Sequence, residues 1–292
     1  MRRKLLVPSI LAALSLVGIG AGSSQAASRW DRIDCAVNGK RDRDLDVVGL
    51  TRAGRLVCFE ANNPRGATVI GRISGLQTDT KLVGIDYRPA TGSLYGLGNQ
   101  GGVYVLNPAN ARANLRARLN VALSGTQFGV DFNPTVDRLR IVSDTGQNLR
   151  ANVDDGTTTT DAPLNYLGPP PVNPAPGITG VAYTNNDASP NTATTLFDVD
   201  TNLDQLAIQA PPNAGTLNPT GKLLADAGDN VGFDIYSTVV NNGWTMQNDA
   251  FASFGTQTGG TFYSVNLLTG TVTPIGQFRH LVVDIAIPLD QL

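Results

Sequence analysis

The chain has 292 residues, with 22 basic and 24 acidic side chains, one histidine and two cysteines. Its formal charge is -2, and it falls to -5 when the three basic residues of an N-terminal leader are removed. This mild acidity argues against nucleic acid or an anionic membrane as a partner. A single histidine excludes multi-histidine metal sites and leaves little room for a Ser-His-Asp triad.

The first 26 residues have the pattern of a secretory signal peptide. Residues 2–4 are basic, Leu5–Gly20 is an apolar run, and Ser24, Gln25 and Ala26 form a small-residue cleavage site. The apolar run is shorter than the roughly 20 residues that a bilayer span needs. We therefore expect an exported protein, periplasmic or extracellular, that is cleaved after Ala26 and has no membrane insertion afterwards.

Residues 27–45 are predicted to form an N-terminal tail, followed by a single domain over 46–292. The tail has few apolar side chains, so little burial offsets the entropy of ordering it. Cys35 lies in the tail and Cys58 lies in the first predicted strands. An even cysteine count in an exported chain predicts one disulfide, Cys35–Cys58.

Three strands are predicted at the start of the domain, at 47–51, 56–60 and 68–71. Groups of four follow along the chain. These are expected at 83–87, 94–97, 103–106 and 115–121; at 128–132, 139–142, 148–153 and 158–164; at 180–183, 195–199, 205–209 and 222–224; and at 232–236, 250–254, 261–266 and 271–275. One strand remains, at 281–286. The segment 185–191 is interpreted as a solvated loop.

The first strands of these groups share one pattern, a strand-like run with an acid near its end in four of the five cases. The aligned positions are Asp86, Asp131, Ala182, Asp234 and Asp284, so the steps are 45, 51, 52 and 50 residues. A fixed period of this length predicts a β-propeller. The lone last strand completes the three-stranded first group. We therefore predict an all-β fold of five four-stranded blades, closed by the C-terminal strand pairing with the N-terminal blade.

Glycine recurs inside the predicted inner strands, at Gly84, Gly129, Gly180 and Gly232. Glycine within a strand commonly marks close backbone approach. We expect these glycines to lie where the inner strands crowd around the hub of the ring.

Several sequence segments resemble those of a known protein family. Phe128–Asn133 followed by 134–140, then 143–149, 204–206 and 211–217, are similar to exported bacterial proteins catalogued only as a domain of unknown function. The resemblance runs from about Val47 to Ile287. It implies a propeller-like fold, and it brings no established activity, ligand or catalytic residue.

The four repeat acids Asp86, Asp131, Asp234 and Asp284 are the sharpest candidate constellation. A ring of carboxylates could hold Ca²⁺, which prefers six to eight oxygen ligands. The interpretation that we favour is structural, with each carboxylate accepting hydrogen bonds from the backbone of a neighbouring blade. Ala182 interrupts the ring. We assign no catalytic, cofactor-binding or metal residue, and these acids stay weak metal candidates.

Two runs imitate calcium-binding loops, at 42–46 and 198–204. Val47 and Leu203 stand where such a loop needs glycine, so turn chemistry is the simpler interpretation. His280 is interpreted as an ordinary loop residue.

These observations favour a non-catalytic exported module that binds a ligand or a protein. The binding surface is expected at one mouth of the channel, near 99–100, 144–145 and 256–257. The alternative is a hydrolase or lyase that acts on a carbohydrate or lactone through aspartates at the channel mouth, with or without calcium.

Overall fold

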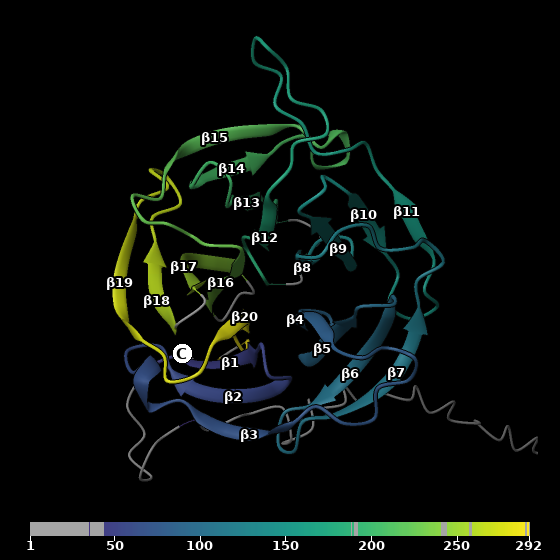
Figure 1. Ribbon diagram of the computed structural model, residues 1–292, viewed down its shortest axis with the longest axis vertical. Helices are drawn as coiled ribbons and strands as arrows, with labels where there is room; N and C mark the ends of the chain where they lie inside the picture. Colours follow the sequence, from purple (N-terminus) through teal and green to yellow (C-terminus); the bar gives the residue numbers. More distant parts are fainter. Residues whose placement is uncertain are drawn as a thin grey trace, which may run out of the picture.

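The computed structural model describes residues 35, 44–187, 189, 192–240, 244–256, 259–289 and 291. Within these ranges, 20 strands form five antiparallel sheets of four strands, arranged as blades around a central axis (Figure 1). The prediction of a five-bladed propeller is confirmed. The predicted leader and most of the predicted tail lie outside the described residues, so the limits 1–26, 27–45 and 46–292 stay predictions.

The blades are named one to five in chain order, and each is given from its inner strand outwards. Blade one contains β20 (Val282–Ala286), β1 (Asp46–Thr51), β2 (Arg55–Glu60) and β3 (Thr68–Arg72). Blade two contains β4 (Leu82–Arg88), β5 (Ser93–Gly98), β6 (Gly102–Asn107) and β7 (Arg112–Arg118). Blade three contains β8 (Phe128–Asn133), β9 (Arg138–Ser143), β10 (Asn148–Ala151) and β11 (Thr158–Thr160).

Blades four and five complete the ring. Blade four contains β12 (Ile178–Tyr183), β13 (Leu196–Asp200), β14 (Gln205–Gln209) and β15 (Leu217–Lys222). Blade five contains β16 (Asn230–Val240), β17 (Trp244–Thr256), β18 (Gly259–Val265) and β19 (Val272–Gln277). Helix in the described ranges is confined to two 3₁₀ turns, Pro64–Gly66 and Pro212–Ala214.

The ring closes as the strand count predicts. β20 pairs antiparallel with β1, with Val48 opposite Ala286 and Leu50 opposite Asp284. The first blade is therefore built from both ends of the domain. Figure 1 shows the yellow β20 beside the purple β1.

Burial explains why inner and outer strands have different sequences. Every residue of β12 is buried, because neighbouring blades cover both of its faces. The outer strand β7 alternates between exposed and covered positions along much of its length. Five clusters of buried apolar side chains each join two neighbouring blades. The core is therefore divided among the blade interfaces, and it holds the ring together as a unit.

The inner strands approach one another closely, as the glycine pattern predicts. A Cβ atom on Gly129 would lie 2.8 Å from the backbone nitrogen of Val181, and a Cβ on Gly232 would lie 2.5 Å from the Cα of Asp284. Neither neighbour is a flexible side chain that could move aside. Close backbone approach is therefore the reason for glycine at these two positions.

Two local expectations, on strand bounds, were wrong, and a third segment has contacts that were not predicted. Strands β16 and β17 extend beyond the predicted 232–236 and 250–254 to form a long hairpin. The outer strand of blade four is β15, ahead of the predicted 222–224. The start of the predicted solvated loop packs on the long hairpin: the Asn185 backbone N–H donates to Asn248 Oδ1 (3.0 Å), and that of Asn186 donates to Ser237 Oγ (2.9 Å).

The predicted disulfide is present. Cys35 and Cys58 are bonded, with their Cα atoms 5.3 Å apart. Cys58 lies on β2, the third strand of blade one. The bond ties Cys35 to the outer half of that blade. No helix in the described ranges is long and apolar enough to cross a membrane.

Candidate functional site

The repeat acids lie on the inner strands and connect neighbouring blades through backbone hydrogen bonds. All four side chains are buried, with at most 7% exposed. Each carboxylate accepts a backbone N–H from the next blade around the ring. The pairs are Asp284 with Ile85 (2.7 Å), Asp86 with Phe132 (2.7 Å), Asp131 with Tyr183 (3.2 Å) and Asp234 with Ile287 (2.6 Å).

Three of the acids also accept the backbone N–H of the residue that follows them. These are Asp86 (2.7 Å), Asp234 (2.6 Å) and Asp284 (2.9 Å). The second carboxylate oxygen then reaches the neighbouring blade, so one short side chain joins two strands. The hydrogen bonds to neighbouring blades that the sequence led us to expect are therefore observed at all four acids.

Three of these acids are the residues that could hold a metal ion. Asp86, Asp131 and Asp234 each place a carboxylate oxygen within 4.8 Å of the other two. Burial raises the pKa of each: to about 7 for Asp234, and well above the ordinary value for Asp86 and Asp131, where neighbouring carboxylates raise it further. A cation would have to share oxygens that already accept backbone hydrogen bonds. Asp86, Asp131 and Asp234 therefore stay weak metal candidates.

The calcium-like run at 198–204 consists of turn and core residues. Asp198 is fully buried on β13, and burial raises its pKa well above the ordinary value. Asp200 accepts the backbone N–H groups of Asn202 (3.0 Å) and Leu203 (2.9 Å), and Asp204 accepts that of Ala227 (3.0 Å). In the other run, Asp42 and Arg43 lie outside the described residues. His280 lies between β19 and β20, as expected for a loop residue.

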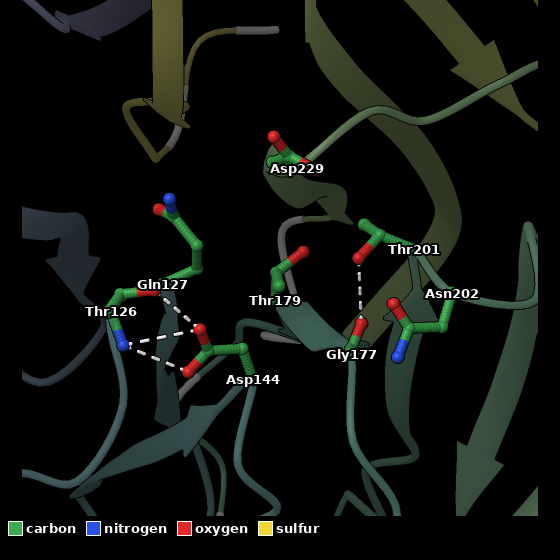
Figure 2. A pocket seen from close by; sticks show the side chains of 8 residues that line it. All are labelled: Thr126, Gln127, Asp144, Gly177, Thr179, Thr201, Asn202 and Asp229. Carbon is green, nitrogen blue, oxygen red and sulfur yellow. Dashed lines mark hydrogen bonds between the residues drawn. The ribbon is translucent and has the colours of Figure 1, made fainter.

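A polar pocket of about 340 Å³ lies at one mouth of the channel (Figure 2). It is built where the inner strands of blades three to five begin and where the second strands of blades three and four end. Its lining consists of Thr126, Gln127, Asp144, Gly177, Thr179, Thr201, Asn202 and Asp229. Of the residues in the turns expected to form a binding surface, Asp144 lines this pocket, whereas Asn99, Gln100 and Thr145 do not. Gln257, in the third of these turns, lies outside the described residues.

Two sides of the pocket are fixed by hydrogen bonds. The Asp144 carboxylate accepts both the backbone N–H (2.9 Å) and the hydroxyl (2.6 Å) of Thr126. The Thr201 hydroxyl donates to the carbonyl oxygen of Gly177 (3.0 Å). These bonds hold the loops of blades three and four in place, while Gln127 and Asn202 present their side chains to the pocket (Figure 2).

Thr179 forms the floor of the pocket between those two sides (Figure 2). It is 3% exposed, and its hydroxyl has no hydrogen-bond partner in the described part of the chain. Leaving a buried hydroxyl unpaired is unfavourable, so such a group commonly has a partner that is absent from the protein itself. Thr179 was not predicted to be a site residue, although the repeat alignment places it in an inner strand.

A second group of residues that was not predicted is a buried polar cluster between blades three and four. Arg140, 1% exposed, donates to Asn148 (2.7 Å), to Asp161 (2.7 Å) and to Asn213 (2.9 Å). Its Nε also donates to the hydroxyl of Tyr183 (3.3 Å). With its donors engaged on both blades, Arg140 adds polar contacts to the apolar packing that also joins blades three and four.

Comparison with known proteins places the chain in a family without an assigned activity. A family model described as "Domain of unknown function (DUF4394)" matches residues 55–286. None of the curated proteins matches the chain.

Solved structures share similarity with the chain at low sequence identity. One is a structural genomics protein of unknown function from Bacteroides thetaiotaomicron, with 14% identity and a TM-score of 0.46, covering 85% of this chain and 67% of that one. A nidogen/laminin complex gives 12% identity and a TM-score of 0.46, covering 84% and 86%. TolB from Acinetobacter baumannii gives 8% identity and a TM-score of 0.44, covering 84% and 67%.

Proposed function

The chain belongs to the DUF4394 family, and we propose that it is an exported, non-catalytic module that binds a small polar ligand in the mouth pocket. The observation that carries this proposal is the buried hydroxyl of Thr179, which has no hydrogen-bond partner among the described residues and lies at the floor of a pocket lined by polar side chains. A rigid propeller with such a pocket at its channel mouth is suited to hold a ligand without moving.

The aspartates favour binding over catalysis. A general acid or base must reach the reacting group, but the four hub acids are buried and accept backbone hydrogen bonds. Asp144 lines the pocket, and its carboxylate is held by Thr126. The disulfide supports the exported location, because such bonds persist in oxidising compartments.

The rival function is a hydrolase or lyase for a carbohydrate or lactone. The observation in its favour is that two carboxylates, Asp144 and Asp229, line the same pocket. Paired carboxylates are the usual machinery of glycoside hydrolysis. This reading requires Asp144 to exchange its bonds with Thr126 for contacts with a substrate.

A ligand screen by thermal shift tests the proposal. The purified chain is screened against sugars, amino acids, amines, organic acids and divalent cations, with and without Ca²⁺ and a chelator. We expect a stabilising ligand whose effect is lost in Asn202→Ala. The matched control is Asn62→Ala, an exposed asparagine on blade one, remote from the pocket.

The outcomes separate the two functions. A ligand shift that is equal in Asn202→Ala and in the wild type would place binding away from the mouth pocket and contradict the proposal. Turnover of a bound sugar, lactone or ester that is abolished in Asp229→Asn would establish the rival function.

A further inference from the structure

We infer that the mouth pocket takes a neutral saccharide and that Thr179 is the residue that hydrogen-bonds its hydroxyl groups. This inference rests on the proposed function and adds the ligand class and the contact residue. Three independent features support it: a break in the repeat, the local backbone geometry and the chemistry of the lining.

Thr179 breaks the repeat at a position that is otherwise apolar. It stands three residues before the aligned acid position, which is Ala182 in its blade. The same position is Val83, Phe128, Val231 and Leu281 in the other four blades. Blade four is therefore the one blade with a hydroxyl at this point of the inner strand, and it contributes half of the lining residues of the pocket.

A bulge in β12 sets the direction of the Thr179 side chain. The pairing of β12 with β13 shifts between Ile178 and Gly180, so Thr179 is the extra residue. The same bulge occurs in blade two, where the pairing shifts between Leu82 and Gly84. The bulged residue there, Val83, packs against the apolar cluster between blades two and three. Bulges re-aim single side chains and are common beside functional sites.

The two equivalent bulges therefore have different uses. The side chain of Val83 packs against apolar neighbours. Thr179 instead places a hydroxyl at the pocket floor, and this hydroxyl has no hydrogen-bond partner in the described part of the molecule. Packing alone would be served equally well by valine, which has nearly the same shape. The hydroxyl is the feature that packing does not explain.

The lining suits a ligand that both donates and accepts hydrogen bonds. Beside Thr179, the carboxamides of Gln127 and Asn202 offer donors and acceptors, and the Asp229 carboxylate offers acceptors. Sugar hydroxyl groups match this mixture. The lining residues include no basic or aromatic side chain, so they would not stabilise an anionic or an apolar ligand.

A hard cation fits the pocket less well than a sugar. Ca²⁺ prefers six to eight oxygens, several of them from carboxylates. Asp144 already accepts hydrogen bonds from Thr126. Among the described residues, Asp229 is then the one carboxylate of the lining without an observed hydrogen bond.

Isothermal titration calorimetry of the purified chain tests the inference. The neutral probes are glucose, galactose, mannose, N-acetylglucosamine, maltose and cellobiose. The contrasting probes are galacturonate, spermidine and Ca²⁺. Each is titrated into the wild type and into Thr179→Val, Thr179→Ser and Val83→Thr. The last variant makes the reverse exchange in the equivalent bulge.

We expect at least one neutral sugar to bind. Thr179→Val should weaken it about tenfold through loss of one hydrogen bond, whereas Thr179→Ser and Val83→Thr should change it by less than about threefold. Equal sugar affinity in Thr179→Val and the wild type would overturn the role of Thr179. If the melting temperature of ligand-free Thr179→Val equals that of the wild type, the loss of sugar affinity is not due to loss of folding.

The result can also separate this inference from the proposed function. Binding of galacturonate, spermidine or Ca²⁺ alone, lost in Asn202→Ala, would overturn the saccharide class and leave ligand binding at the mouth intact. Absence of binding by all nine probes would overturn the inference. The proposed function would fail as well if the broad thermal-shift screen were also negative.

Discussion

Aspartate has a specific structural use in this protein. Of the 24 acidic residues, Glu60 is the only glutamate. At the hub, the short aspartate side chain lets one oxygen accept the next backbone N–H while the other reaches an adjacent blade, as Asp234 does for Ile235 and Ile287. A longer side chain would place its carboxylate away from the N–H that follows it.

Asp234→Asn is predicted to lower the free energy of unfolding by about 1–3 kcal/mol at pH 5, because the carboxamide has one acceptor for two buried N–H groups. Chemical denaturation measures the change. The deficit should be smaller at pH 8, because the buried carboxylate then destabilises the wild type itself. A larger deficit at pH 8 would contradict this and would indicate that the fold uses the charged form, as a bound cation would require. Asp226→Asn, in an exposed turn, is the control.

At the residue scale, the roles of residues that recur in the repeat could be predicted from the sequence. The roles of residues that occur in one blade alone could not. The acids recur, so their positions and their backbone partners could be anticipated. A hydroxyl at the position of Thr179 occurs in one blade. Its proposed role depends on a bulge and on the lack of a hydrogen-bond partner in the described ranges, neither of which follows from residue type. Arg140 was missed for a similar reason, since its partners Asp161 and Asn213 come from a loop and from another blade.

At the scale of elements, strand existence was predictable and strand length was not. The period and the turn residues locate each blade. The extension of β16 and β17 depends instead on contacts from blade four, where Asn185 and Asn248 exchange hydrogen bonds. Such contacts join segments about 60 residues apart, so they cannot be predicted from the local sequence pattern.

The disulfide fixes the segment before β1 to the third strand of its blade. Replacing both Cys35 and Cys58 by serine is predicted to lower the free energy of unfolding by about 2–3 kcal/mol. The propeller should persist, because the core lies between the blades. Urea denaturation gives the stability, and an unchanged far-ultraviolet circular dichroism spectrum checks the fold. Reduced wild type should match the variant, and loss of the β-sheet spectrum in either would contradict the prediction.

At the scale of the whole molecule, the hub links the five blades through buried carboxyl groups. Burial raises the pKa of Asp234 to about 7 and those of Asp86, Asp131 and Asp284 well above the ordinary value. An acid with a raised pKa contributes stability below its unfolded pKa and loses it as pH rises through the folded pKa. The ring should therefore be more stable in mild acid than in mild base.

We predict that the free energy of unfolding falls by about 2 kcal/mol or more between pH 5 and pH 8. Denaturation curves at one-unit intervals measure it. Asp154 acts in the opposite direction, because Arg88 and Arg116 lower its pKa to about 2, and its effect is confined to pH values below about 4. A free energy of unfolding that is constant or rises from pH 5 to pH 8 would contradict the prediction that the hub carboxyl groups are protonated at pH 5. Recovery of the free energy of unfolding on addition of Ca²⁺ at pH 8 would indicate a cation at the hub.

The pairing of β20 with β1 also fixes an order of events in time. β1 leaves the ribosome before the other strands of the ring, and its inner partner leaves last. Asp46 and Gln291, which also share a hydrogen bond, are 245 residues apart. Throughout this interval β1 has an open edge, the kind of edge that pairs with other chains. A folded product that stops before Val282 would therefore leave the inner edge of β1 without its partner strand.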